Sequence, residues 1–328
     1  MSKELGQGHR FMEKCIMKTV RIKKMNKEMP AVVVGCMRQA GFTDRPFTPQ
    51  EMNHFIHTAV ENGANYFDHA DIYGMGRAEL VFGEALALKD SSLKREDLII
   101  QSKCGIRREF YDSSKEHILQ SVDGILERLQ TEYLDVLLLH RPDSLIEPEE
   151  VAEAFDELYK NGKVRNFGVS NYTPGQIELL QKYAKQELAV NQMECSIVHA
   201  GMISSGIEAN MTSSGSVDHD GGVLDYCRLK DITIQTWSPF QISLHDGTFI
   251  DNPAYPELNE QLLTLAEKYG TTKAGIAEAW LLRHPAGMQV VIGTSREDRL
   301  VELIKASDIT LSREEWYSLY LAGGHILP

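Results

Sequence analysis

Residues 97–140 read DLIIQSKCGIRREFYDSSKEHILQSVDGILERLQTEYLDVLLLH. Two short apolar runs, at 97–103 and 133–140, enclose a segment at 117–130 whose apolar residues recur at helical spacing. Because a crossover that contains a helix returns the chain parallel to the strand it left, the stretch predicts a strand, a helix and a parallel strand. One βαβ unit is therefore expected here.

The same alternation extends over most of the chain. Six further strands are expected at 31–35, 64–68, 163–170, 188–192, 231–237 and 288–293. Eight strands that alternate with helices close into a barrel, so the predicted fold is an α/β (β/α)8 barrel. The alternative, a doubly wound Rossmann sheet, would carry a G-x-G-x-x-G turn after its first strand, and none follows 31–35.

The first expected helix carries clear end signals. Thr48 is followed by Pro49 and, three residues after Thr48, by Glu51, which is the pattern of a capping box. The amphipathic run MNHFIHTAVENG ends at Gly63, a residue that favours the left-handed conformation after a helix. A helix is therefore predicted between these signals.

Three segments lie outside a minimal barrel. Residues 17–30 predict a hairpin that turns at Met25–Asn26–Lys27 and plugs the bottom of the barrel. The segments at 199–222 and 241–256, rich in Gly and Ser or in Gly and Pro, are expected to be long loops at the C-terminal face. Residues 1–328 are predicted to form one domain, with 1–16 as an N-terminal extension.

Composition excludes several classes of protein. The chain has 328 residues, of which 42% are hydrophobic and 25% charged, so it has ample apolar material for a large core. Its formal net charge of -13 disfavours nucleic acid as a partner. Neither a signal peptide nor an apolar run of about 20 residues is present, so we expect no membrane span and a cytoplasmic location. A monomer or a weakly associating homo-oligomer is expected.

The cysteines predict neither disulfides nor a zinc site. There are five of them, which is an odd number, and no C-x-x-C pair occurs. Buried free thiols are the expected state of Cys15, Cys36, Cys104, Cys195 and Cys227.

Four polar residues emerge at one rim of the predicted barrel. Asp68, Lys103 and His140 end three neighbouring expected strands, and Tyr73 follows Asp68 in the next loop. Barrel enzymes build their sites at this rim. Taken singly, each has a structural explanation, since a rim Asp and Lys often form an ion pair and a lone Tyr is often a packed ring. Together they favour a catalytic site.

The four side chains suit the reduction of a carbonyl. Negative charge develops on the carbonyl oxygen during reduction, so an acid must protonate it, and Tyr73 is the candidate. An isolated phenol has a pKa of about 10, which a neighbouring ammonium such as Lys103 lowers by stabilising the phenolate. Asp68 would keep Lys103 charged and in place. His140 would orient the carbonyl.

The chain resembles an aldo-keto reductase. That family uses such a tetrad, and further motifs match in order: GVSN at 168–171, NQ at 191–192, WSP at 237–239 and AWLLRHP at 279–285. Within the family the chain is most similar to the bacterial general oxidoreductases. The resemblance implies NADP(H) as cofactor and a small-molecule carbonyl substrate.

The resemblance also assigns cofactor contacts. Ser170, Asn171 and Gln192 would bind the nicotinamide carboxamide, and Trp237 would stack on the nicotinamide ring. Turn formation and rim packing are the structural alternatives for these residues. The full set of expected cofactor residues is Gly35, Arg38, Ser170, Asn171, Gln192, Trp237, Ser238, Gly293, Thr294, Ser295, Arg299 and Glu302.

Residues 293–302 are expected to hold the cofactor's phosphates. Hydroxyls and backbone N–H groups at a helix start, together with Arg299 and Arg296, form a phosphate site of the kind barrels often carry there. Glu302 would accept from the adenine amine. Relatives that prefer NADPH often have Lys where this chain has Gly293. A solvated helix start is the alternative, and NADP is predicted over NAD.

The loops at this rim also carry candidate substrate contacts. Met37, Arg38, Phe110, Tyr111 and Phe240 either line a partly apolar pocket or pack the loops themselves. Asp68, His69 and Asp71 lie close together in the sequence. Strand alternation directs Asp68 and His69 to opposite faces, and no paired-ligand spacing such as His-x-His accompanies them, so no metal site is expected.

The predicted function is NADPH-dependent reduction of an aldehyde, ketone or quinone, with Tyr73 as the acid. The sequence also allows two alternatives from other functional classes. One is a cofactor-binding sensor or regulatory partner with vestigial turnover, and the other is a metal-dependent hydrolase on the same barrel.

Overall fold

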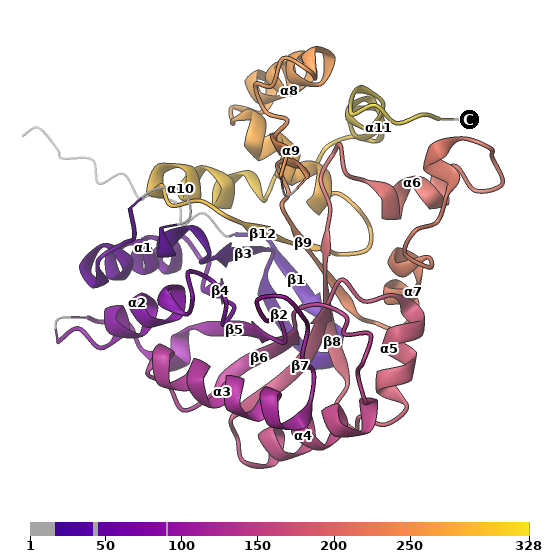
Figure 1. The fold of residues 1–328 in the computed structure, drawn as a ribbon. Coiled ribbons are helices and arrows are strands. Elements are labelled where there is room, and N and C mark those ends of the chain that lie inside the picture. Colours follow the sequence, from indigo (N-terminus) through magenta and orange to yellow (C-terminus); the bar gives the residue numbers. More distant parts are fainter. Residues whose placement is uncertain (1–16, 42–44, 90, 244, 328) are drawn as a thin grey trace, which may run out of the picture.

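The structure, a computed structural model, describes residues 17–41, 45–89, 91–243 and 245–327. Its centre is a closed barrel of parallel strands in the order β12-β3-β4-β5-β6-β7-β8-β9 (Figure 1). The strands are β3 (Val32–Gly35), β4 (Tyr66–Asp68), β5 (Ile99–Cys104), β6 (Leu134–Leu139), β7 (Val164–Ser170), β8 (Leu188–Glu194), β9 (Thr233–Trp237) and β12 (Gln289–Ile292). The predicted (β/α)8 barrel is confirmed.

Strand ends differ from the predicted ones by at most two residues. β4 begins at Tyr66 rather than at Ala64, for example. The N–H of Ala64 donates to the carbonyl of Ala59 at 2.9 Å, so Ala64 still belongs to the turn that ends the preceding helix. Such a local hydrogen bond takes a residue out of the strand even when its side chain is apolar.

Helices connect and surround the strands. They are α1 (Pro49–Glu61), α2 (Arg77–Leu86), α3 (Lys115–Leu129), α4 (Pro148–Lys160), α5 (Pro174–Gln181), α6 (Gly201–Ile207), α7 (Val223–Leu229), α8 (Pro256–Tyr269), α9 (Lys273–Leu282), α10 (Glu297–Ala306) and α11 (Arg313–Ala322). The predicted capping box is confirmed: Thr48 accepts from the Glu51 N–H, and Glu51 accepts from the Thr48 N–H. α3 begins earlier than expected because Ser114 caps it.

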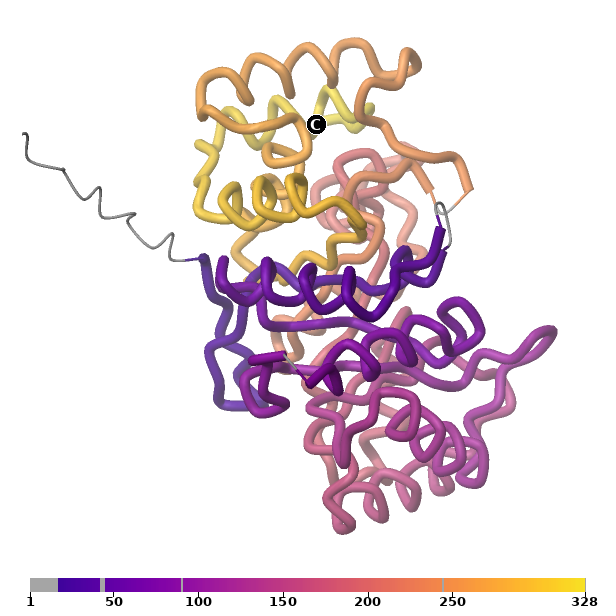
Figure 2. Tube along the Cα trace, turned by 90° about the vertical axis from the view of Figure 1, so that its left-hand side faces the viewer, coloured from indigo at the N-terminus to yellow at the C-terminus, as the bar shows by residue number. Residues whose placement is uncertain are grey.

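The predicted N-terminal hairpin is also confirmed. β1 (Thr19–Ile22) pairs antiparallel with β2 (Lys27–Pro30) through a short 3-10 turn, in which Asn26 adopts the left-handed conformation at φ 50°. Ile22 and Met29 are buried in one cluster with barrel residues such as Val33, so the hairpin closes one end of the barrel (Figure 2, indigo). The other end carries the loops in which a site was expected.

Two of the expected long loops contain secondary structure. Residues 199–222 include the short helix α6 and a 3-10 turn, because Met202 and Ile203 are buried within a segment otherwise rich in small polar residues. In the second segment, β10 (Gln241–Ser243) pairs with β11 (Gly247–Thr248). The prediction of unstructured loops was wrong in both places.

The strands bury both of their faces. Outward side chains and the helices form one large apolar layer, in which Phe155 of α4 stacks on Phe167 of β7 at 4.2 Å between ring centroids. Cys36, Cys104, Cys195 and Cys227 are buried free thiols, whereas Cys15 lies outside the described residues. No helix in the described part of the chain is long and apolar enough to cross a membrane.

Candidate active site

The four predicted catalytic residues meet at the open end of the barrel. Asp68 ends β4, Lys103 lies near the end of β5, and His140 directly follows β6. Tyr73 reaches the same place from the loop after β4. Strand alternation turns Asp68 and Lys103 into the barrel, and both are almost completely buried.

Lys103 connects the group through hydrogen bonds. Its Nζ donates to Asp68 Oδ2 at 2.6 Å, to the carbonyl of His69 at 2.8 Å and to Tyr73 Oη at 3.1 Å. An ammonium has three N–H donors, so all of them have acceptors. The Tyr73 oxygen accepts from Lys103, and its own proton therefore remains available to another oxygen.

A tight turn fixes the Tyr73 ring. The Tyr73 N–H donates to the Ala70 carbonyl at 3.0 Å, and Gly74 has φ 58°. A Cβ on Gly74 would lie 2.5 Å from the Cβ of Ala40, so only glycine fits there. The Tyr73 and His140 rings form a T-shaped pair, with 5.9 Å between the ring centroids.

The pKa shifts follow from burial and from the ion pair. Burial acts to lower the pKa of Lys103, but Asp68 and Tyr73 outweigh it and the pKa lies above its ordinary value. The pKa of His140 is held well below its ordinary value by burial, then by Lys103 and Arg141, so the imidazole is neutral. Its Nδ1 is buried without a partner in the described structure.

For Tyr73 the net direction differs from the prediction. Burial raises the pKa of Tyr73 above 10, and Lys103, although it acts to lower the pKa as expected, does not outweigh burial. The phenol is therefore protonated at neutral pH. That is the form a proton donor requires.

Three neighbouring strands carry the expected nicotinamide contacts. Trp237 Nε1 donates to Asn171 Oδ1 at 3.1 Å, and Asn171 Nδ2 donates to Ser170 Oγ at 2.8 Å. Ser170 Oγ in turn donates to the Gln192 carbonyl at 3.0 Å. The structure thus brings Ser170, Asn171, Gln192 and Trp237 together beside the tetrad.

One residue at this place was not assigned a role from the sequence. The guanidinium of Arg141 lies 5.5 Å from the centre of the Trp237 ring. A cation over an aromatic face restrains the ring, which leaves its other face to a planar ligand. The signal was present in the sequence, since Arg141 directly follows His140 at the rim.

Comparison with known proteins agrees with this geometry. The sequence profile of the aldo/keto reductase family matches residues 31–320. The chain belongs to this family. It is 35% identical to the oxidoreductase YcsN of Bacillus subtilis, over 86% of this chain and 91% of that protein. It is 31% identical to a 6-dehydroglucose reductase of Agrobacterium fabrum, over 89% and 94% of the two chains.

A solved structure gives the same result. A thermostable aldo-keto reductase, crystallised with the inhibitor epalrestat, superposes with a TM-score of 0.72 at 27% identity, over 94% of this chain and 99% of that one. The chain is thus an oxidoreductase of the aldo/keto reductase family.

In this family member the expected phosphate segment lies at the start of α10. Thr294 Oγ1 accepts from the Arg296 N–H at 3.1 Å, and the Thr294 carbonyl accepts from Gln39. Arg296 forms a two-pronged ion pair with Asp298. Arg299 and Glu302 are exposed on α10. Arg296 is therefore already paired with a carboxylate.

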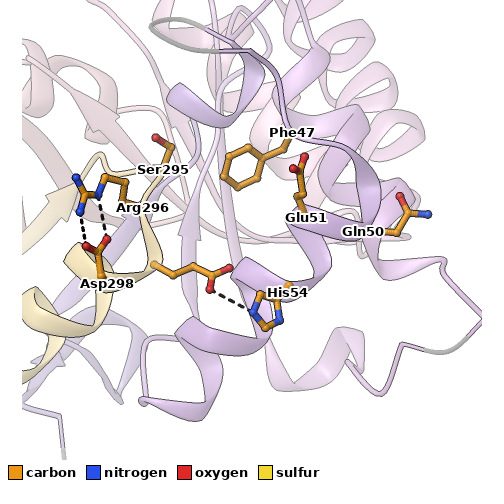
Figure 3. A pocket seen from close by; sticks show the side chains of 8 residues that line it. Phe47, Gln50, Glu51, His54, Ser295, Arg296 and Asp298 are labelled. Atoms are coloured by element: carbon orange, nitrogen blue, oxygen red, sulfur yellow. Dashed lines mark hydrogen bonds and ion pairs between the residues drawn. The ribbon is translucent and has the colours of Figure 1, made fainter.

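A cavity of about 610 Å³ opens beside this segment, between the starts of α1 and α10 (Figure 3). Its lining residues are Phe47, Gln50, Glu51, His54, Ser295, Arg296, Glu297 and Asp298. His54 Nε2 lies 3.2 Å from a Glu297 oxygen at one side, and the Arg296 pair lies at the other. Its three carboxylates make it a poor site for a bare anion.

Two glycines in the expected set have different surroundings. A Cβ on Gly35, at the end of β3, would lie 3.0 Å from the Ile292 carbonyl, so the glycine allows close approach of β12. At Gly293 a Cβ would lie 3.5 Å from Arg38 Nε. Arg38 therefore covers the place where other family members were expected to carry a lysine.

The remaining predicted residues are less closely grouped. Ser238 has φ 52° and donates to Gln241 Oε1 at 2.6 Å, within its own loop. Phe110 and Tyr111 are 60% and 45% exposed on the loop after β5. Phe240 is half-buried and packs against the outer core. Met37 is half-buried beside Arg38.

The residues considered as metal ligands separate as strand alternation predicts. Asp68 points into the barrel toward Lys103, whereas the His69 ring lies outside it against Phe82, at 4.6 Å between centroids. Within the described ranges, no group of three His, Cys, Asp or Glu side chains could hold a metal ion.

The sequence reasoning missed a set of buried polar residues inside the barrel. Tyr66, Gln101, Gln235 and Gln289 lie below the tetrad and are fully buried. The three glutamines lie within the strand sequences IIQSK, TIQTW and QVVI. A lone glutamine at an inward position of a barrel strand is the signal that could have found them.

Proposed function

We propose that this aldo/keto reductase family member reduces the carbonyl of an aldehyde, ketone or quinone with NADPH. The observation that carries the proposal is the contact of Tyr73 Oη with Lys103 Nζ at 3.1 Å, with Lys103 itself held by Asp68 at 2.6 Å. A proton donor beside a fixed cation at a barrel rim is what carbonyl reduction requires of the protein.

The chain's own residues divide the work. Tyr73 gives its proton to the substrate oxygen, and Lys103 stabilises the phenolate that remains. Neutral His140, whose buried Nδ1 has no partner in the described structure, directs its ring toward that oxygen and orients the carbonyl. Asp68 keeps Lys103 charged.

The residues present fit a nicotinamide dinucleotide. Bound NADPH would supply hydride to the carbonyl carbon. Ser170, Asn171 and Gln192 offer the amide and hydroxyl groups that a carboxamide needs, and the face of Trp237 away from Arg141 offers a stacking surface.

The phosphate contacts would come from the loops after β12 and β3, and β12 pairs with β9, the strand that carries Trp237. Arg38 lies above Gly293, and no ion pair of its guanidinium occurs among the described residues. Thr294 and Ser295 directly follow Gly293, and Arg299 is exposed in the first turn of α10. A guanidinium can donate two parallel N–H bonds to phosphate oxygens, so Arg38 and Arg299 are the favoured phosphate ligands. Glu302 would contact the adenine.

The test is Tyr73→Phe, which removes the acid and keeps the ring. We expect NADPH binding, followed by cofactor fluorescence, to be unchanged, and reduction of a reactive aldehyde to fall by about 100- to 10,000-fold. Tyr159→Phe, at an exposed tyrosine of α4, is the matched control and should keep full turnover. Turnover by Tyr73→Phe at the parent rate would refute the mechanism.

Tight NADPH binding without turnover of any aldehyde, ketone or quinone by the parent protein would favour the alternative function, a cofactor-binding sensor.

A further inference from the structure

A continuous chain of buried hydrogen bonds connects the hairpin at the bottom of the barrel to the tetrad at its mouth. Gln289 Nε2 donates to the Pro30 carbonyl at 2.6 Å, and Gln235 Nε2 donates to Gln289 Oε1 at 3.0 Å. Gln101 and Gln192 each donate from Nε2 to Gln235 Oε1, at 3.0 and 3.1 Å.

This series of hydrogen bonds ends at the carboxylate of Asp68. Gln101 Nε2 donates to Asp68 Oδ1 at 2.6 Å, and Gln192 Nε2 donates to the same oxygen at 3.1 Å. The other oxygen, Oδ2, accepts from Lys103. Tyr66 joins two of these glutamines: its hydroxyl donates to Gln101 Oε1 at 2.8 Å and accepts from Gln235 Nε2 at 3.2 Å.

The orientation of these amides is dictated from the bottom of the barrel. A backbone carbonyl can only accept, so Gln289 must present its NH₂ group to Pro30 and its oxygen to Gln235. Gln235 must then present its NH₂ to Gln289 and its oxygen to Gln101 and Gln192. The amides of Gln101 and Gln192 consequently direct N–H groups at Asp68, which as a carboxylate can only accept. A flip of one amide would oppose two donors in a buried place, which is costly.

We propose that Gln289, Gln235, Gln101 and Gln192 act as positioning residues, which hold the Asp68 carboxylate aimed at Lys103 and thereby keep Lys103 in contact with Tyr73. The inference rests on the proposed role of Tyr73 as acid. Because both N–H groups of Gln192 are engaged, its oxygen is the atom left for a carboxamide NH₂.

The consequence is measurable at Tyr73. Two donors on Oδ1 draw the charge of Asp68 away from Oδ2, which leaves more of the Lys103 charge to stabilise a phenolate. Without them Oδ2 neutralises Lys103 more strongly, so the pKa of Tyr73 rises. The titratable groups that face Tyr73 are Lys103 from β5, Asp68 from β4, Cys36 after β3 and His140 after β6. None of them is changed by the variants below.

Two variants test the proposal at its two ends. Gln101→Met removes a direct donor to Asp68, and Gln289→Met removes the anchor on Pro30 without touching Asp68. Thr236→Val is the matched control. Thr236 is equally buried on β9 and donates to the Gln289 carbonyl at 3.3 Å, but its side chain takes no part in the amide chain.

The readout needs neither cofactor nor turnover. Each full-length protein is labelled with meta-fluorotyrosine, whose fluorine lowers the phenol pKa and reports its ionisation by NMR. The resonance missing from Tyr73→Phe identifies Tyr73. We expect its pKa to rise by about one pH unit in Gln101→Met and by a smaller amount in Gln289→Met, and to stay at the parent value in Thr236→Val.

An unchanged or lowered pKa of Tyr73 in Gln101→Met would overturn the proposal. Should that variant not fold, Gln289→Met decides: an unchanged pKa there overturns the proposal and a raised one supports it. An inactive Tyr73→Phe beside an unshifted Gln101→Met would reject the positioning role alone. A parent that never reduces a carbonyl would reject the proposed function, while the titration would still be measurable.

Discussion

The two faces of the barrel wall differ sharply although the same strands form both. On β6, Leu137 packs outward into the large apolar layer under the helices, whereas Leu138 packs inward. On β5 and β9, inward positions carry Gln101 and Gln235, whose amides hydrogen-bond to Asp68, to Tyr66 and to each other. The inside has an apolar plug at the hairpin, then a polar layer, then the tetrad.

The difference shows where stability and chemistry are placed. The outer face gains free energy from burial of apolar surface, and a local defect there costs stability in proportion to the lost contacts. Buried polar groups gain little net stability, but a single unpaired one is costly, so the inner face works only as a complete set. We therefore expect outer and inner substitutions to have different signatures.

Lys103→Met should have the largest effect, because it removes the cation beside Tyr73 and leaves Asp68 buried without its counter-ion. We expect carbonyl reduction to fall at least about 1,000-fold and the free energy of unfolding to fall by about 3–5 kcal/mol. Aldehyde reduction and urea unfolding measure the two. Lys163→Met breaks the exposed pair with Asp123 and should cost less than about 1 kcal/mol. Parent-like turnover by Lys103→Met would show that the inner ion pair is only structural.

Phe155→Ala tests the outer face. The variant loses the stack on Phe167 and leaves a cavity between α4 and β7, so unfolding should become easier by about 3 kcal/mol. Turnover per folded molecule should stay within about twofold of the parent, since no inner contact changes. Leu179→Ala, at an exposed position of α5, serves as control. A large loss of turnover with intact folding would mean that the two faces are coupled.

Buried His69, on the outer face of the barrel wall, should make the free energy of unfolding depend on pH. Burial, and then Lys103, lower the pKa of His69 to about 3, whereas in the unfolded chain it is about 6.5. The unfolded state therefore binds the proton first, and stability falls as pH drops below 6.5, by about 1.4 kcal/mol per pH unit for this group. At pH 5, His69→Leu should recover about 2 kcal/mol of that loss relative to pH 7.5. An identical pH dependence of unfolding in both proteins would contradict this.

Asp298→Asn should have the smallest effect. Its carboxylate holds Arg296, and without it Arg296 is free to approach a phosphate at the start of α10. We expect NADPH to bind about two- to fivefold more tightly, with little change for NADH, as exposed ion pairs are worth less than about 1 kcal/mol. Calorimetric titration of the two cofactors measures the difference. Equal tightening for both would place the 2′-phosphate elsewhere.

The outer face was largely predictable from the sequence. Apolar periodicity, the Thr48 cap and the strand runs depend on local pattern, and the structure confirms them. The grouping of the four candidate residues could be predicted because Asp68, Lys103 and His140 end successive expected strands. The inner amides could not be paired in advance, since the partner of Gln289 lies 259 residues away at Pro30 and depends on barrel closure.

The structure of the loops was also poorly predicted from the sequence. In α6, two buried apolar residues lie among glycines and serines, so the composition indicated a loop. The raised pKa of Tyr73 was missed for a related reason: a sequence names the cation beside the phenol but not the depth of burial that opposes it. The formation of α6 and the pKa of Tyr73 both depend on packing from distant segments.

A crystal structure of the chain with bound NADPH would test the central claim most directly. The account predicts that Tyr73 Oη stays within hydrogen-bonding distance of Lys103 Nζ and that both face the nicotinamide, with Asp68 still joined to Gln101. A complex in which Tyr73 faces away from Lys103 or from the nicotinamide would contradict it.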